Sequence, residues 1–358
     1  MKYRCCGHLL NSSMFFLGHV NRECVTFCCV PGHSPPRLAM AETPEETIAN
    51  YVKLRTEIIA EGVKIGLLNE SNISIDDRKY TKACHNCPLY HEMEVLPSDI
   101  GLVGHVTFGF YPSICQIKCI YCRRREDGDD YEPFSKELHE KGYDRVFATV
   151  EYAQKTGLIA PDATWAVSCG EITIHPYRDR IYEIVKGMPT AFYSNCCIFE
   201  PRIAENLGAS QGSILSFSID SGTPSTWHKI KGVNNFNKVL GNLMKYSQKA
   251  VNPQQIDLKY IVLPGLNDTL ADYKGIVRIM KMLRQDRLVI SRETYGVTPA
   301  SRPDDPTSNL SYNERVIEAA SRLMAMLLEN GLHCHHVWGF STEDRQKLHE
   351  ATLGAYGN

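Results

Sequence analysis

The sequence predicts an α/β protein: a partial (β/α)6 TIM-like barrel with a Cys-rich, metal-binding extension at its N-terminus and a helix and strand at its C-terminus. Two observations favour this class. From about residue 101, short apolar runs alternate with helical stretches, as in parallel β/α units. The 358 residues, 43% of them hydrophobic and 22% charged, are enough to bury one large core. We expect the extension over 1–98, the barrel over 99–300 and the C-terminal part over 301–358.

The first element of the extension, residues 1–40, is rich in Cys, His, Gly and Pro, and we expect it to be irregular and held together by a metal. A helix follows from about residue 43 to 65. Thr43 is a suitable N-cap, Pro44 takes the first helical position, and two acidic residues follow in the first turn.

The barrel strands are expected at apolar runs bounded by turn residues: 102–110, 164–168, 190–194, 214–219, 256–263 and 287–291. A last helix over 312–329 then leads into a strand at 332–337. Because the chemistry of β/α barrels takes place at the carboxyl ends of the strands, polar residues that follow these runs are the candidate site residues.

Charge and cysteine content limit the class of function. The formal net charge of −2 gives no general electrostatic reason to expect nucleic-acid or membrane partners. The apolar run at 14–20 is too short to span a bilayer, and no signal-peptide cleavage pattern follows it. The 14 cysteines occur in groups, which is typical of metal or redox chemistry in a reducing compartment. We therefore expect a cytoplasmic protein.

The densest cysteine group follows the first barrel strand. Cys115, Cys119 and Cys122 form a CxxxCxxC motif, with Tyr121 directly before the last cysteine. Three thiolates on one short loop can hold three irons of a 4Fe–4S cluster, which leaves the fourth iron open to a small-molecule ligand. The alternatives are a zinc loop or thiols without a metal, although structural zinc usually takes a fourth protein ligand nearby.

This motif resembles the signature of the radical SAM superfamily, and the resemblance covers about residues 100–300. It implies an oxygen-sensitive enzyme in which the cluster reductively cleaves S-adenosylmethionine and the resulting 5′-deoxyadenosyl radical abstracts hydrogen from a substrate. A reductant such as flavodoxin or ferredoxin is implied as well. The stretches CGEITIHP, SIDSGTPSTWHKIKGVNNF and KYIVLPGLND are similar to those of an uncharacterised bacterial group with an extra N-terminal Cys-rich segment. That likeness implies no particular substrate.

The resemblance also implies a set of cofactor-binding residues. Gly170 and Glu171 look like part of the superfamily's GGE motif, whose acid receives the methionine amino group, although Cys169 replaces the first glycine. The fourth and fifth strands are expected to present groups to the ribose, the carboxylate and the adenine. The full set is Tyr121, Gly170, Glu171, Ser218, Asp220 and Leu263.

Other cysteines permit a second metal site. The candidate ligands are Cys6, Cys28, Cys29, Cys84 and Cys87, and both zinc and a second 4Fe–4S cluster suit such thiolates. Buried thiols without a metal are the alternative, because cysteine also packs as a small hydrophobe. Cys197, after the third strand, is a candidate to return a hydrogen atom to a substrate radical, with packing as its alternative role.

Three classes of function are compatible with these residues. The first is an enzyme that modifies a peptide or protein. The second is an enzyme that acts on a small molecule such as a sugar or nucleotide. The third is a non-catalytic zinc- or iron–sulfur-binding interaction module, which would yield no 5′-deoxyadenosine.

Overall fold

The computed structural model describes residues 2–6, 13–18, 24–27, 37–68, 74–84, 91–94, 102–110, 114–122, 136–168, 170–293 and 311–356. The chain forms two compact units. Unit 1 comprises Met1–Ile114 and Glu132–Ala191, and unit 2 comprises Cys115–Tyr131 and Phe192–Asn358. Each unit is described by itself, and the predicted regions 1–98, 99–300 and 301–358 stay a prediction.

Unit 1 contains a sheet with β6 (Val103–Phe110) near its centre. This strand pairs in parallel with β7 (Ile159–Val167) on one side and with β2 (Met14–Gly18) on the other. From β2 the sheet continues, antiparallel, through β3 (Cys24–Thr26) and β4 (Leu38–Ala39).

The prediction that residues 1–40 are irregular is therefore wrong for β2, β3 and β4, and it is also wrong for the strand at Lys2–Cys5. Alternate side chains of β2, Met14 and Phe16, are fully buried. The Phe16 ring stacks on that of Phe108 in β6, with centroids 6.2 Å apart. An apolar strand that pairs with the sheet edge gains both backbone hydrogen bonds and buried area, and this outweighs the turn-rich composition around it.

The helices of unit 1 include the predicted one, α2 (Pro44–Leu68), in whose first turn Thr43 Oγ1 accepts a hydrogen bond from the Glu46 N–H. Its Tyr51 hydroxyl donates to the Ser13 carbonyl beside β2 at 2.7 Å. The helix α3 (Lys136–Lys155) packs against α2 and lies between β6 and β7 in the chain, as a β/α unit requires. Two shorter elements follow β7: η6 (Ile172–Ile174) and α4 (Arg178–Ile184).

The segment that carries Cys84 is held against α2. It contains η2 (Ile75–Asp77) and η3 (Lys82–Cys84). The Glu61 carboxylate on α2 accepts the backbone N–H groups of residues 79, 80 and 81 at 2.7, 2.9 and 2.6 Å. Separately, β1 (Lys2–Cys5) pairs antiparallel with β5 (His91–Glu94), with Cys5 opposite His91.

The sheet of unit 2 has the strand order β8-β9-β10-β11-β12. Its strands are β8 (Thr190–Tyr193), which enters the unit at Phe192, β9 (Ile214–Ser218), β10 (Ile256–Val262), β11 (Arg287–Arg292) and β12 (His333–Trp338). The pairs β9–β10, β10–β11 and β11–β12 are parallel. The strand predicted at 332–337 corresponds to β12 of this sheet.

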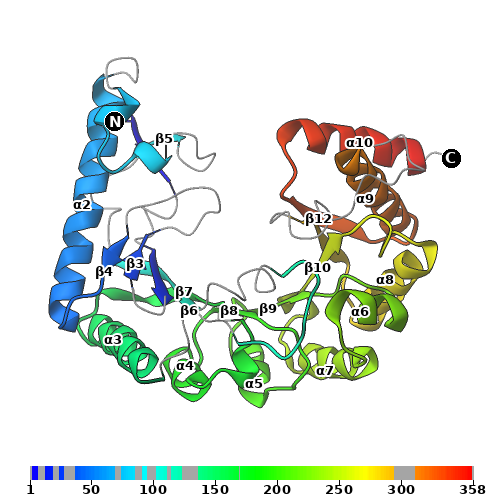
Figure 1. Ribbon diagram of the computed structural model, residues 1–358, viewed down its shortest axis with the longest axis horizontal. Helices are drawn as coiled ribbons and strands as arrows, with labels where there is room; N and C mark the ends of the chain where they lie inside the picture. Colours follow the sequence, from blue (N-terminus) through cyan, green and yellow to red (C-terminus); the bar gives the residue numbers. More distant parts are fainter. Residues whose placement is uncertain are drawn as a thin grey trace. The chain divides into compact units, whose positions relative to one another are not determined.

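Helices cover one face of these strands, where α5, α6, α7 and α8 lie on the same side (Figure 1). They are α5 (Pro201–Ala209), α6 (Pro224–Lys231), α7 (Phe236–Lys249) and α8 (Leu270–Met282), and η7 (Pro253–Gln255) precedes β10. Toward the C-terminus, α9 (Tyr312–Glu329) packs against α10 (Thr342–Tyr356). Alternate residues of β9 and of the first half of β10 are buried, and those between them, including Ser216, Ser218 and Lys259, are partly exposed, whereas the last three residues of β10 are all buried. The predicted α/β class, with parallel strands that alternate with helices, is confirmed.

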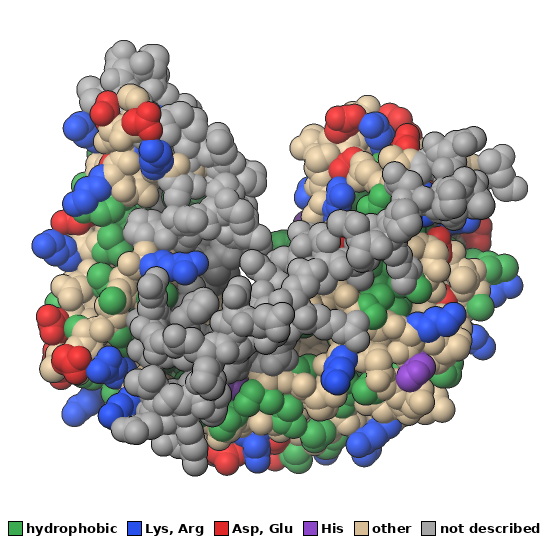
Figure 2. All heavy atoms as spheres, in the orientation of Figure 1, with side chains coloured by type: hydrophobic (Ala, Val, Ile, Leu, Met, Phe, Trp, Pro, Cys, Tyr) green, Lys and Arg blue, Asp and Glu red, His purple; other side chains and the backbone are tan. Residues whose placement is uncertain are grey.

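Two surface properties bear on partners. None of the helices in the described part of the chain combines the length and apolarity that a bilayer crossing requires. On the face shown in Figure 2, described acidic and basic side chains are interspersed along α2, so this helix presents no surface of a single charge there.

Candidate functional site

The cysteine loop, residues 115–122, is fixed to the C-terminal end of α6. The N–H groups of Lys118 and Ile120 donate to the carbonyl oxygens of Lys231 and Ile230 at 3.0 and 2.9 Å. The last carbonyls of a helix have no partner within the helix, so the loop supplies the donors that this end requires. The helix stops at Gly232, whose φ of 72° is in the left-handed region that favours glycine.

A buried ion pair lies beneath the loop. Lys231 Nζ is 2.6 Å from Asp220 Oδ2 and donates to the Tyr121 hydroxyl at 2.5 Å. The Tyr121 hydroxyl in turn donates to Asp220 Oδ2 at 2.5 Å. The side chains of Lys231 and Asp220 are 3% and 0% exposed, so water does not screen this pair. The ammonium also lies 5.0 Å from the centre of the Tyr121 ring.

Asp220 is held in place by the strand next to it. Its Oδ1 accepts the Ile261 N–H at 2.7 Å, and its carbonyl accepts Asn267 Nδ2 at 2.9 Å. Its φ is 45°, a conformation that aspartate tolerates better than most residues. The Asn267 amide also donates to the Ile261 carbonyl at 2.8 Å and so ties the turn after β10 to the same point. The Asp220 carboxylate therefore accepts hydrogen bonds from Ile261, Lys231 and Tyr121.

The local electrostatics are dominated by burial. Burial raises the pKa of the Cys119 thiol, and the neighbouring Lys231 ammonium opposes this increase. Burial also raises the pKa of Tyr121 well above its usual value, so its hydroxyl stays protonated. Burial by itself would lower the pKa of Lys231, but Asp220 and Cys119 outweigh it, and the pKa is raised. Lys231 is therefore a permanent cation beside Cys119.

The remaining loop contacts orient the other cysteines. Asn195 Nδ2 donates to Cys115 Sγ at 3.3 Å, and the Cys122 N–H donates to the Cys119 carbonyl at 3.0 Å. The apolar side chains of Ile120 and Tyr121 pack against a buried group formed by Ile230, Ile261 and Leu263.

The donor set of the loop fits an iron–sulfur cluster in its chemistry, because soft thiolates on one short segment are the ligands that such clusters take. Within the described residues, however, no three or more Cys, His, Asp or Glu side chains are gathered closely enough to hold a metal ion. The cluster at Cys115, Cys119 and Cys122 therefore stays a prediction.

The GGE-like stretch lies in unit 1. Glu171 is fully buried, and its Oε1 accepts the N–H and the hydroxyl of Thr173 at 3.1 and 2.7 Å, which caps η6. The Glu171 N–H donates to the carbonyl of Ile114, the residue before the cysteine loop, at 2.8 Å. Gly170 has a φ of 72°, which explains a glycine at this position. Cys169 lies outside the described residues.

The structure places the other candidates as follows. Ser218 ends β9 and is partly exposed, whereas Leu263 is only 2% exposed. Cys197 is buried, and its Sγ accepts Asn235 Nδ2 at 3.0 Å. The Cys197 N–H donates to Asn195 Oδ1 at 3.0 Å, so the same asparagine contacts both Cys115 and Cys197. The proposed hydrogen return by Cys197 stays a prediction.

For the second metal site, the structure describes only part of the candidate set. Cys6 is buried in unit 1 and Cys84 is half-buried at the end of η3. Cys28, Cys29 and Cys87 lie outside the described residues. This site also stays a prediction.

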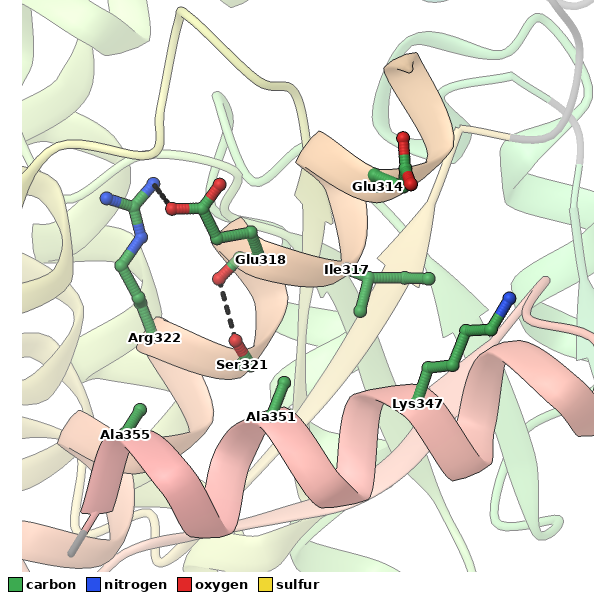
Figure 3. Close-up of a pocket in the computed structure, with 8 residues that line it drawn as sticks. All are labelled: Glu314, Ile317, Glu318, Ser321, Arg322, Lys347, Ala351 and Ala355. Carbon is green, nitrogen blue, oxygen red and sulfur yellow. Dashed lines mark hydrogen bonds and ion pairs between the residues drawn. The ribbon is translucent and has the colours of Figure 1, made fainter. Parts of the chain in front are cut away.

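A separate groove of about 450 Å³ lies between α9 and α10 (Figure 3). Ile317 and Ala351 face each other across it, and the paired Glu318 and Arg322 lie on its α9 side. None of the residues that line this groove belongs to the cysteine loop or to the buried ion pair.

No family model and no curated protein matches the chain. The chain is similar to solved structures of radical SAM enzymes. One is SuiB of Streptococcus suis bound to precursor peptide SuiA, with 11% identity, 98% of this chain and 75% of that chain covered, and a TM-score of 0.45. A radical SAM methyltransferase from Sphaerobacter thermophilus has 14% identity, 64% of each chain covered and a TM-score of 0.39. Likenesses at such TM-scores assign neither a substrate nor a reaction.

Proposed function

We propose that this protein is a radical SAM enzyme. The observation that carries the proposal is the cysteine loop itself: three cysteines on eight residues, docked on a helix end, with a buried cation beside Cys119. A 4Fe–4S cluster bound there would supply the electron that cleaves S-adenosylmethionine to methionine and a 5′-deoxyadenosyl radical. The chain's contribution is to hold the three thiolates, to leave one iron uncapped and to position both cofactors.

The proposed roles of the other residues follow the sequence motifs. Glu171 would receive the ammonium group of S-adenosylmethionine, and Gly170 would let the backbone approach it. Ser218 would contact the ribose or carboxylate, and the segment around Leu263 would pack against the adenine. For Asp220, the buried contacts with Lys231, Tyr121 and Ile261 support a role in holding the loop rather than a direct cofactor contact.

A second metal site in the N-terminal region is part of the proposal, with Cys6, Cys28 or Cys29, Cys84 and Cys87 as ligands. The pairing of β1 with β5 supports it, because β1 directly precedes Cys6 and β5 follows the CxxC in the sequence. Elemental analysis of a variant that lacks Cys115, Cys119 and Cys122 tests this site, since any metal that the variant retains must be bound elsewhere. If that variant contains neither iron nor zinc, and if Cys84 is open to alkylation in the folded protein, the second metal site does not exist.

The enzymatic proposal is tested by anaerobic reconstitution with iron and sulfide, followed by reduction with dithionite in the presence of S-adenosylmethionine. Wild type should form 5′-deoxyadenosine, and the variant with Cys115, Cys119 and Cys122 changed to Ala should form none. Cys334→Ala is the matched control, because this cysteine lies in β12 and outside the motif. Product from the triple variant, or none from a brown, iron-loaded wild type, would contradict the proposal. In the second case, the chain would be the non-catalytic iron–sulfur module.

Glu171→Gln tests the proposed cofactor contact separately from the cluster. Glutamine keeps the size of the side chain but removes the charge that an ammonium group prefers. Calorimetry should show weaker binding of S-adenosylmethionine at unchanged cluster iron. The substrate, a peptide or a small molecule, and the natural reductant, such as flavodoxin or ferredoxin, are not needed for either assay.

A further inference from the structure

We propose that Lys231 is a positioning residue for the cysteine loop, and that it both fixes the loop before a cluster assembles and sets the charge beside Cys119. This inference rests on the proposed function, because it assigns a role to a residue outside the CxxxCxxC motif. Lys231 is 112 positions away from Cys119 along the chain, and the fold brings the two together.

The first part of the argument is mechanical. Lys231 holds the loop at two points: its carbonyl accepts the Lys118 N–H at 3.0 Å, and its ammonium donates to the Tyr121 hydroxyl at 2.5 Å. These two contacts bracket Cys119 on both sides in the sequence. A ligand whose neighbours are fixed loses less conformational freedom when it binds a metal, so the loop is preorganised.

The second part is electrostatic. The Lys231 side chain is 3% exposed and its counter-ion Asp220 is 0% exposed, so their fields act across protein rather than across water. A cluster gains negative charge when it is reduced, and a nearby buried cation favours the reduced form. Lys231 therefore raises the reduction potential of a cluster at this site, and Asp220 lowers it.

The third part of the argument concerns variants that remove one or both charges of the Lys231–Asp220 pair. The Asp220 carboxylate also accepts the Ile261 N–H at 2.7 Å, so it stays anchored when the lysine is changed. Lys231→Met keeps the length of the side chain but leaves this carboxylate without its counter-ion, which is costly in the interior and could prevent folding. The double variant Asp220→Asn, Lys231→Met removes both charges and keeps a polar partner for Ile261. Lys229→Met, an exposed neighbour on the same helix, is the control.

Two measurements on reconstituted protein test the proposal: the rate of iron loss to a chelator, and the midpoint potential followed by electron paramagnetic resonance. Lys231→Met should lose iron at least about 10-fold faster than wild type, because removal of a group that orients a metal-binding segment costs about 10- to 100-fold in metal affinity. Its midpoint potential should be lower than that of wild type. The double variant should regain a potential close to wild type but still lose iron faster, and Lys229→Met should match wild type in both.

The outcomes are distinguishable. Wild type that binds no cluster would overturn the proposed function. Wild type that binds a cluster while folded Lys231→Met shows the same iron loss and the same potential would overturn this inference alone. If Lys231→Met does not fold, the double variant decides, and iron loss equal to that of wild type would overturn the inference.

Discussion

The two cysteine-bearing regions of the chain are built in different ways. The cysteine loop in unit 2 is fixed by a helix end, a buried ion pair and an apolar group, and each of these contacts involves residues of the loop itself. In unit 1, Cys6 directly follows β1, which pairs with β5, and Cys84 ends η3, which follows a backbone segment held by the Glu61 carboxylate of α2. The loop is therefore fixed by side-chain and backbone contacts from several elements of unit 2, whereas the contacts described for the N-terminal segments act on the backbone next to their cysteines.

The largest effect on stability is expected from a change in the backbone packing that supports the loop. Gly222 in unit 2 lies against α8 so closely that an added Cβ would be 1.9 Å from the Asp272 carbonyl oxygen. Backbone atoms cannot move there without a large cost in free energy. Gly222→Ala should therefore destabilise unit 2 by more than about 4 kcal/mol, measured by denaturant unfolding.

Gly241→Ala in α7 is the control for this change. An added Cβ there meets nothing within 4 Å, and alanine favours a helix, so this variant should be more stable than wild type by about 0.5–1 kcal/mol. If Gly222→Ala instead unfolds like wild type, the packing under the loop is not rigid and the contrast between the two regions weakens.

The next largest effect concerns β2 in unit 1. Phe16 is fully buried against Phe108, so Phe16→Ala should cost about 3–5 kcal/mol of folding free energy. Leu102→Ala, at a half-exposed leucine before β6, should change stability by about 0.5 kcal/mol or less. A cost for Phe16→Ala as small as that of the control would mean that the N-terminal strand is not part of the core.

A smaller effect is expected from pH in the same unit. Burial, together with the nearby Arg178, lowers the pKa of His175 to about 4 from an ordinary value of 6.5. Between these two values the unfolded chain takes up a proton and the folded chain does not. Stability therefore falls as the pH drops from about 6.5 to 4, by about 3 kcal/mol from this residue, with no further loss below that range.

Replacing His175 with Gln should flatten this part of the stability profile, because glutamine does not titrate. Urea unfolding at pH 7, 5.5 and 4 measures the difference between the two proteins. An unchanged slope in the variant would show that His175 is not the group responsible.

The sequence predicted the regular part of the fold well. The strands expected at 102–110, 190–194, 214–219, 256–263 and 287–291 lie within two residues of β6, β8, β9, β10 and β11. The second expected strand begins earlier, at Ile159 rather than 164. Its extra residues include Pro161, beside a register shift in the pairing with β6, and a proline there reads as a loop in sequence.

The remaining features depend on contacts between distant residues. In sequence, Lys231 is one of two lysines at the end of a helix, and nothing local distinguishes it from its exposed neighbour Lys229. Asn195 is likewise a polar residue after a strand, and only the fold brings it to Cys115 and Cys197. The strand at Met14–Gly18 could not be predicted from alternation, because residues 14–17 are all apolar, and only its pairing with β6 makes it a strand.

The central claim is that the loop holds a cluster with one iron left open for S-adenosylmethionine. Electron paramagnetic resonance of the reduced, reconstituted protein with and without S-adenosylmethionine tests it most directly, because a ligand that binds the open iron changes the signal. We expect a clear change in the g-values on addition of the cofactor, and no cluster signal from this site in the variant without Cys115, Cys119 and Cys122. An identical spectrum with and without S-adenosylmethionine, at concentrations where calorimetry shows binding, would contradict the account.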